Sequence, residues 1–232
     1  MSTKPFRAGF LLFPHLTQLD LTGPYQVLAS LPGAEIQLIW KTREPVAAEH
    51  GLAILPTTTF ADCPPLDLIC VPGGVGVNAI LTDRETLDFL RRMAAGARYV
   101  TSVCTGALAL GAAGLLRGKR ATTHWMSLDM LRAFGAEPVA ARVVVDGNLI
   151  TGGGVTAGID FGLTVAAEIA GQRVAEAIQL GIEYDPQPPF DAGSPATADP
   201  ALVALVRERA AGRQSERAER VREAAAAMDA SW

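Results

Sequence analysis

Short apolar runs alternate along the chain with longer amphipathic stretches. Four of these runs are short enough for buried strands, at residues 7–13, 34–41, 67–71 and 99–103. The stretch after the first run predicts a helix that ends near Ser30. A second helix is predicted over residues 81–97, where apolar residues share one face and Asp83 is placed to cap it. Strands that alternate with helices favour an α/β fold with a mostly parallel sheet and helices on both faces.

The second half of the chain adds a hairpin, a further helix and a charged tail. Asp146-Gly147-Asn148 is a hairpin turn signal between apolar runs at 142–145 and 149–151, and a helix is predicted over 156–170. The Pro- and Gly-rich segment 186–200 indicates a surface crossing. The tail beyond it predicts a solvated helix docked by Leu202, Leu205 and Val206. We therefore expect one α/β domain over residues 1–200, with residues 201–232 as a helical extension packed on it.

Composition narrows the class of protein. The chain has 232 residues, of which 49% are hydrophobic, and this is enough for a substantial core. Its net charge of −4 disfavours a nucleic acid partner, which requires clustered positive charge. No apolar run predicts a signal peptide or a membrane span. Three cysteines without framework spacing favour a reducing cytoplasm, and their spacing matches no familiar zinc pattern.

Cys104 lies where a predicted strand changes into a predicted helix. A residue at such an elbow is pushed out at the top of the sheet, beside the free N–H groups of the first helical turn. Those groups and the helix dipole stabilise a thiolate, so Cys104 is a candidate nucleophile. The alternative is a buried core cysteine. Cys70, at the end of a strand, indicates a core residue, and Cys63 indicates a loop residue.

Asp20 is the candidate acid/base partner of this cysteine. It could instead cap the following helix, but Thr22 is the better cap, because Pro24 fits only the first turn of a helix. Asp20 is then left between two leucines just past the first strand. Partial desolvation there raises the pKa of a carboxyl group and lets it hold a proton for acid–base work.

Two glycine stretches and three histidines remain. Gly73-Gly74 follows the third strand, and its backbone N–H groups could approach a reacting atom as an oxyanion hole. Gly152-Gly153-Gly154 either lines a pocket with Thr156 or allows close packing. His124 is most simply a strand-end histidine with a satisfied hydrogen bond. His15 could border a pocket, and His50 is expected to be exposed.

Ordered motifs over nearly the whole chain resemble the ThiJ/PfpI superfamily of flavodoxin-like α/β proteins, which is related to the class I glutamine amidotransferase fold. The motifs are GFLLFP, QLDLTGP, FADCPPLD, PGG, RYVTSVCTGALALGAAGLL, RATTHW, DGNLITGGGVTAGIDF and PPFDAGSP. The resemblance implies Cys104 as the nucleophile, Asp20 as the general acid/base and Thr105 as a threonine needed for activity. It also implies backbone N–H donors at Gly74 and Thr105, a homodimer, and no metal or organic cofactor.

Within that superfamily the motifs are most similar to the branch that hydrates isocyanides. The expected partners are therefore a small isocyanide and water, and the expected product is an N-substituted formamide formed through a thioimidate on Cys104. Two alternatives stay open. One is a cysteine-dependent enzyme of the same superfamily that acts on aldehydes or peptides. The other is a ligand-sensing module like those of AraC-type regulators, although only about 30 residues follow Pro200 where those regulators add roughly 100 for a helix-turn-helix region.

Overall fold

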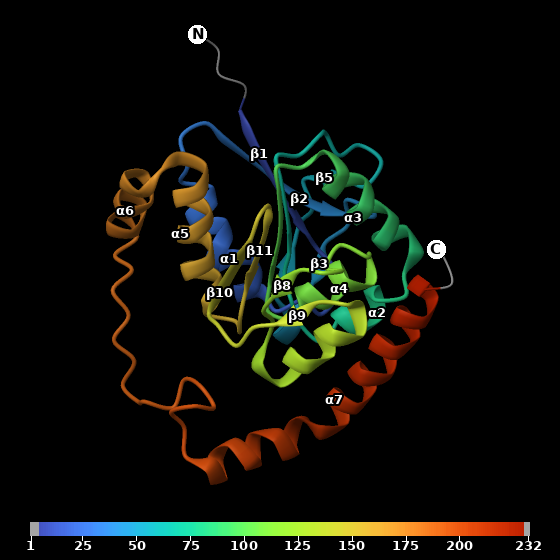
Figure 1. Ribbon diagram of the computed structural model, residues 1–232. Coiled ribbons are helices and arrows are strands. Elements are labelled where there is room, and N and C mark those ends of the chain that lie inside the picture. Colours follow the sequence, from blue (N-terminus) through green and yellow to red (C-terminus); the bar gives the residue numbers. More distant parts are fainter. Residues whose placement is uncertain (1–4, 230–232) are drawn as a thin grey trace.

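A single seven-stranded sheet forms the centre of the computed structural model, which describes residues 5–229 (Figure 1). The strand order is β10-β11-β7-β6-β1-β2-β5, and all neighbours are parallel except β10 and β11. These strands are β1 (Phe6–Leu11), β2 (Ala34–Trp40), β5 (Thr58–Thr59), β6 (Leu68–Val71), β7 (Tyr99–Val103), β10 (Val143–Asp146) and β11 (Leu149–Gly152). The mostly parallel α/β sheet predicted from the sequence is confirmed, with one antiparallel strand at its edge.

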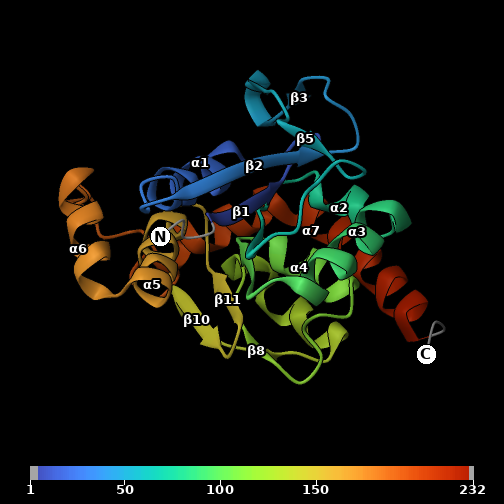
Figure 2. The same ribbon diagram turned by 90° about the horizontal axis from the view of Figure 1, so that it is seen from above.

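Helices cover both faces of this sheet, as Figure 2 shows. On one face lie α1 (Gln18–Leu28), α5 (Ala157–Ala170) and α6 (Gln172–Gly181), and on the other α2 (Val77–Ile80), α3 (Arg84–Gly96) and α4 (Gly106–Ala112). The chain ends in α7 (Pro200–Asp229). Smaller elements are two strand pairs, β3 (Val46–Ala47) with β4 (Ala53–Ile54) and β8 (Arg120–Ala121) with β9 (Glu137–Pro138), and two 3-10 helices, η1 (Glu49–Gly51) and η2 (Trp125–Phe134). None of the helices in the described part of the chain is both long and apolar enough to cross a membrane.

The register of the sheet brings three strand ends together. Val71 of β6 lies opposite Ser102 of β7, and Val103 of β7 lies opposite Gly152 of β11. The segments that follow these strands therefore meet at one edge of the sheet. In parallel α/β sheets this carboxyl edge is where ligand sites form.

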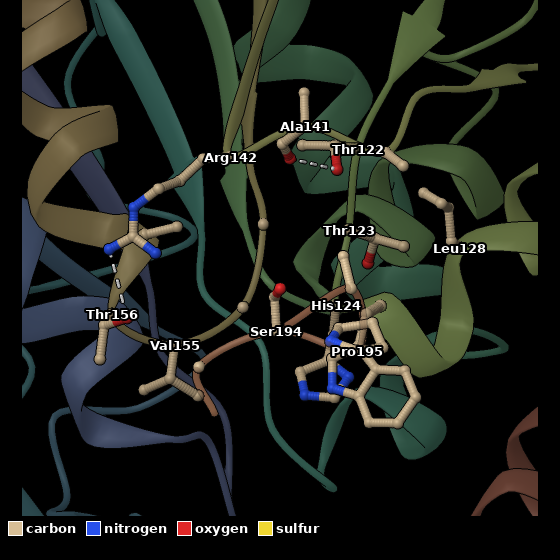
Figure 3. Close-up of a pocket in the computed structure, with 17 residues that line it drawn as sticks. Thr122, Thr123, His124, Leu128, Ala141, Arg142, Val155, Thr156, Ser194 and Pro195 are labelled. Atoms are coloured by element: carbon tan, nitrogen blue, oxygen red, sulfur yellow. Dashed lines mark hydrogen bonds between the residues drawn. The ribbon is translucent and has the colours of Figure 1, made fainter. Parts of the chain in front are cut away.

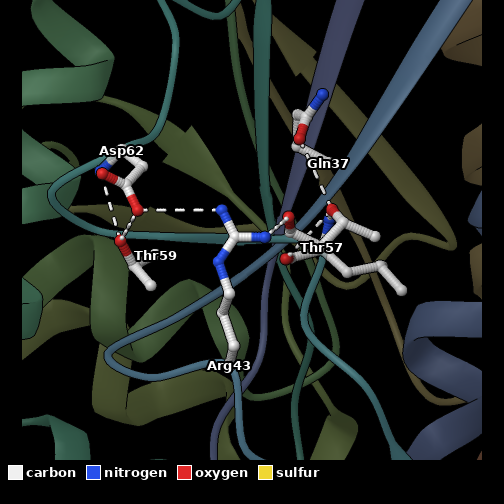
Figure 4. Close-up of polar contacts among 6 residues, drawn as sticks. Gln37, Arg43, Thr57, Thr59 and Asp62 are labelled. Carbon is white, nitrogen blue, oxygen red and sulfur yellow. Dashed lines mark hydrogen bonds and ion pairs between the residues drawn. The ribbon is translucent and has the colours of Figure 1, made fainter.

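Edge strand β5 is fastened to its neighbour by polar side chains (Figure 4). Thr57 Oγ1 accepts a hydrogen bond from the backbone N–H of Leu38 at 2.8 Å. Arg43 donates to the Thr57 carbonyl at 3.0 Å and pairs with Asp62 at 3.7 Å. These contacts join the start of β5 to β2 and to the loop that holds Asp62.

The first helix begins earlier than the sequence indicates. Thr22 was expected at its cap, but α1 begins at Gln18 after Thr17. Thr22 lies inside the helix and its hydroxyl donates to Gln18, so the capping prediction is wrong. Pro24 is tolerated in the helix because its ring packs against α5, where a Cβ on Gly158 would lie 2.9 Å from Pro24 Cδ. Tertiary packing thus overrides the local preference, and Asp20 falls in the first turn of α1.

The C-terminal helix docks through residues other than those expected. Leu202, Leu205 and Val206 are exposed, with 42% of the Leu202 surface open to solvent, so that prediction is wrong. The helix is buried instead at a series of positions further along: Ala210, Arg217, Val221, Ala224 and Met228. It packs on η2, α4 and α2 after the exposed crossing at 186–199 (Figure 1). Residues 1–4 and 230–232, which the two predicted ranges include, lie outside the described residues.

Gly106, the first residue of α4, allows this helix to approach β6 closely. A Cβ added there would collide with the Val71 carbonyl oxygen and would lie 2.7 Å from the Pro72 carbonyl oxygen. We expect Gly106→Ala to lower the free energy of unfolding by about 1–3 kcal/mol, because backbone atoms must move to admit the methyl group. Gly96→Ala is the control, since an added Cβ there meets nothing within 4 Å. Equal denaturation midpoints for the two variants would contradict the close approach.

Candidate active site

Cys104 occupies a strained backbone position at the end of β7. Its φ is +53°, in the left-handed region that residues with a side chain rarely adopt. Three hydrogen bonds hold this conformation. The backbone N–H of Cys104 donates to the carbonyl oxygens of Gly152 at 3.1 Å and Gly153 at 2.8 Å, and its own carbonyl accepts from the Thr123 hydroxyl at 2.6 Å. The elbow predicted from the sequence is therefore present, and the side chain is 4% exposed.

Asp20 meets Cys104 from the first turn of α1. The carboxyl group is fully buried, and its Oδ2 accepts a hydrogen bond from the backbone N–H of Gly73 at 2.9 Å. The other carboxyl oxygen, Oδ1, is buried and has no hydrogen bond of standard geometry within residues 5–229. Burial raises the pKa of Asp20 to about 7, although hydrogen bonds from the Cys104 thiol and from Gly73 act to lower it. A carboxyl group with this pKa can both give and take a proton near neutral pH.

Burial also raises the pKa of the Cys104 thiol, and a charged Asp20 raises it further. A hydrogen bond from the backbone N–H of Thr105 lowers it, but burial is the larger cause. The sequence predicted a thiolate stabilised by the following helix, and here the structure differs. Burial and a charged Asp20 therefore both oppose a free thiolate at Cys104. A thiolate forms when the proton moves from Cys104 to Asp20.

Gly74 and Thr105 are hydrogen-bonded to each other beside this pair. The backbone N–H of Gly74 donates to Thr105 Oγ1 at 3.0 Å, and the Thr105 hydroxyl lies 3.2 Å from the Gly74 carbonyl oxygen. Gly74 has a φ of +132°, and a Cβ there would lie 2.5 Å from the backbone nitrogen of Thr17. Glycine is therefore required at this position. We expected the Gly74 N–H to face the reacting atom, but in this structure it is engaged by Thr105.

A cavity of about 490 Å³ opens next to the elbow (Figure 3). Gly153 and Thr156, the two residues predicted to line a pocket, are both in its wall, and Gly152 instead packs on Phe161. The cavity adjoins the nucleophile through Thr123 and Gly153, which bond the backbone of Cys104. Most of the wall is apolar, and its larger apolar members are Trp125, Leu128, Val155 and Pro195.

The histidines and the other cysteines lie away from the acid–base pair. His124 precedes η2, where its Nδ1 accepts from the Met126 N–H at 3.3 Å, and its ring is part of the cavity wall. His15 and His50 are exposed, and the cavity wall includes neither. Cys70 is buried in β6 and Cys63 is in a loop, which confirms both predictions.

Sequence reasoning missed two charged residues that hold the glycine turn. Glu49 accepts from the backbone N–H of Val75 at 2.9 Å and from the Thr17 hydroxyl at 3.1 Å. Arg217 of α7 donates to the Gly74 carbonyl oxygen at 3.3 Å. Both residues are far from the glycine turn along the chain, and no motif around them indicates such a contact.

Comparison with known proteins shows which family and fold this chain shares. An isonitrile hydratase of Pseudomonas putida is 60% identical over 221 residues, which cover 95% of this chain and 97% of that protein. A solved ThiJ/PfpI family protein from Pseudomonas syringae superposes with a TM-score of 0.92 at 46% identity, over 94% of this chain and 91% of that one. The transcriptional regulator GbdR of Pseudomonas aeruginosa is 34% identical over 78% of this chain, but this chain spans only 52% of the regulator. The family model described as DJ-1/PfpI matches residues 6–168, and the chain therefore belongs to the DJ-1/PfpI family.

Proposed function

We propose that this chain is an isocyanide hydratase, which adds water to R–N≡C and releases an N-substituted formamide. The observation that carries the proposal is the buried pair of Cys104 and Asp20, a sulfur nucleophile beside a carboxyl group whose pKa is raised to about 7. The 60% identity to the isonitrile hydratase of Pseudomonas putida supports the same reaction.

In the first half of the reaction, the terminal carbon of the isocyanide gains a proton and a sulfur substituent. The pair that holds one proton supplies both: Asp20, once it has taken the thiol proton, gives it to carbon, and the Cys104 thiolate bonds to the same carbon. The product is the thioimidate R–N=CH–S on Cys104, with Asp20 left as a carboxylate. The hydrogen bond from the Thr105 N–H stabilises the sulfur anion before attack.

In the second half, water replaces sulfur on that carbon. The Asp20 carboxylate takes a proton from water, the hydroxyl group bonds to carbon, and the proton passes on to nitrogen. Asp20 then removes the hydroxyl proton as the carbon–sulfur bond breaks. This releases R–NH–CHO and restores the thiolate with a protonated Asp20. No amine leaves in this sequence, so the reaction needs no histidine acid.

The simplest test is a substrate panel on the unmodified protein. We expect formation of the N-substituted formamide from a simple isocyanide, followed by mass spectrometry, and no comparable turnover of methylglyoxal or a peptide. Preferred turnover of methylglyoxal or the peptide would favour the alternative enzyme of the same superfamily. Absence of all three activities would favour a ligand-sensing module, as would specific binding in a DNA shift assay.

We further propose that the R group of the isocyanide occupies the cavity beside Cys104. Leu128→Trp should fill part of this cavity, because Leu128 is in its wall. We expect kcat/KM for cyclohexyl isocyanide to fall about tenfold relative to methyl isocyanide, since a hydrophobic pocket discriminates by size to about this extent. Asp129→Trp introduces the same side chain at the neighbouring position, where the side chain is 94% exposed, and should leave the ratio unchanged. Equal losses for both substrates in Leu128→Trp would place the R group elsewhere.

The homodimer and the cytoplasmic location implied by the superfamily resemblance remain predictions. Light scattering after size-exclusion chromatography measures the mass of the assembly in solution. A mass of about 24.3 kDa, that of one chain, would contradict the homodimer.

A further inference from the structure

We propose that Arg217 of the C-terminal helix is a positioning residue for the Cys104 chemistry, which fixes the Gly74 peptide that is hydrogen-bonded to Thr105. The inference rests on the proposed function for its role in turnover. It assigns part of the active site to a helix that lies outside residues 6–168, the range matched by the DJ-1/PfpI family model.

The guanidinium group of Arg217 joins three segments of the domain to α7. Nη2 donates to the Gly74 carbonyl oxygen at 3.3 Å, Nε to Asn78 Oδ1 at 3.0 Å and Nη1 to Ser127 Oγ at 3.3 Å. These acceptors belong to the glycine turn, α2 and η2, and the arginine is 6% exposed. Figure 1 shows α7 returning across the domain to the side of α2 and α4. A single side chain therefore sets how this helix sits against the glycine turn.

Two residues, Gly74 and Thr105, connect Arg217 to the nucleophile. The Gly74 carbonyl oxygen accepts from Arg217, while the same peptide is bonded through its N–H to Thr105 Oγ1. Thr105 directly follows Cys104, and its backbone N–H bonds the sulfur. A shift of the Gly74 peptide would therefore move the group that stabilises the thiolate.

Within residues 5–229, no carboxylate directly contacts the guanidinium group of Arg217. Its three hydrogen-bond acceptors are a backbone carbonyl, a side-chain amide and a hydroxyl group, and no salt bridge joins it to any residue within 5–229. A buried cation without an ion pair is costly, and a nearby anion compensates it. Among the nearby groups, the Cys104 thiolate favours the charged form of Arg217 most, Glu49 and Glu216 favour it less, and the charge of Arg213 opposes it. Arg217 therefore favours the state in which sulfur is charged and Asp20 holds the proton.

The test follows the reactivity of Cys104 as well as turnover. Alkylation by iodoacetamide, measured between pH 5 and 10 and assigned to Cys104 by peptide mass spectrometry, reports thiolate formation without any isocyanide. We expect Arg217→Gln to raise the apparent pKa of this profile by about one unit, and to lower the alkylation rate and kcat/KM near pH 8 about tenfold. Arg217→Lys keeps the charge and should restore the profile in part. Arg220→Gln is the matched control, because it removes an exposed arginine of the same helix.

The outcomes separate this inference from the proposed function. An unchanged alkylation profile in folded Arg217→Gln would overturn the positioning role, even if kcat/KM fell, because the proposed role requires the substitution to change thiolate formation at Cys104. If the unmodified protein turns over no isocyanide, the proposed function fails, and the alkylation profile still decides the role of Arg217. Should Arg217→Gln not fold, Ser127→Ala and Asn78→Ala each remove one anchor of the guanidinium group. These variants should raise the apparent pKa in the same direction, and unchanged profiles in both would overturn the proposal.

Discussion

Replacement of Cys104 by alanine is expected to abolish isocyanide hydration while the protein stays folded and binds its substrate. The thiolate is the only protein group that bonds to the substrate carbon in the proposed reaction, so no thioimidate can form without it. Loss of a covalent nucleophile typically lowers turnover by on the order of 10⁴-fold or more. The backbone of the elbow should persist, because its three hydrogen bonds involve main-chain atoms of residue 104 rather than sulfur.

The measurement for Cys104→Ala is formamide production at saturating isocyanide, with binding followed by calorimetry. Cys63→Ala is the matched control, since it makes the same chemical change in a loop away from the acid–base pair. Undiminished hydration by Cys104→Ala would end the covalent mechanism. A loss of binding with unchanged kcat would mean that Cys104 holds the substrate but does not react with it.

Replacement of Asp20 by asparagine is the second large effect. Asparagine keeps the shape of the side chain and can still accept the Gly73 N–H, which Asp20 Oδ2 accepts at 2.9 Å, but it carries no exchangeable acid proton. We expect kcat to fall about 10²–10⁴-fold, the usual extent of general acid–base catalysis. Asp62→Asn, at an exposed carboxylate on the edge of the sheet, is the control and should keep full activity.

The pH dependence of activity gives the Asp20 prediction a second readout. In the unmodified protein, kcat/KM should rise through a pH of about 7, because the doubly protonated pair then loses its first proton and the reactive form appears. Asp20→Asn removes this carboxyl group, so the rise near 7 should disappear from its residual activity. A rise near 7 that persists in Asp20→Asn would assign the titration to another group.

The free energy of unfolding should also depend on pH, because Asp20 has different pKa values in the folded and the unfolded chain. The carboxyl group ionises near 3.8 in the unfolded chain and at about 7 in the folded one, so the folded state binds more protons between these values. The free energy of unfolding of the unmodified protein therefore falls as pH rises from about 4 to about 7, by about 4 kcal/mol at about 1.4 kcal/mol for each unit. Asp20→Asn has no group that titrates at this position, so it should not lose stability in this way. The difference between its denaturation midpoint and that of the unmodified protein should therefore increase as pH rises from about 4 to about 7. A constant difference would mean that Asp20 is not desolvated.

Local pattern in the sequence was enough to predict six of the seven strands of the sheet, all except β5, and the elbow. The run at 99–103 coincides with β7, and the small residues after Cys104 form α4 as expected. The helix predicted over 156–170 appears as α5, after the glycine triplet. These features depend on the alternation of strands and helices and on glycine where close approach is needed, and both are properties of neighbouring residues. The candidate pair of Cys104 and Asp20 could therefore be named from the sequence.

Only the tertiary structure decided how these residues behave chemically. The raised pKa values of Asp20 and Cys104 depend on burial, which is produced by segments distant along the chain. Pro24 lies inside α1 and packs against α5, and docking of α7 brought Arg217 to the Gly74 carbonyl. The sequence determined the strands, the elbow and the reactive residue types. Long-range packing determined desolvation, charge and contacts at the site, because these arise from neighbours in space that local pattern does not identify.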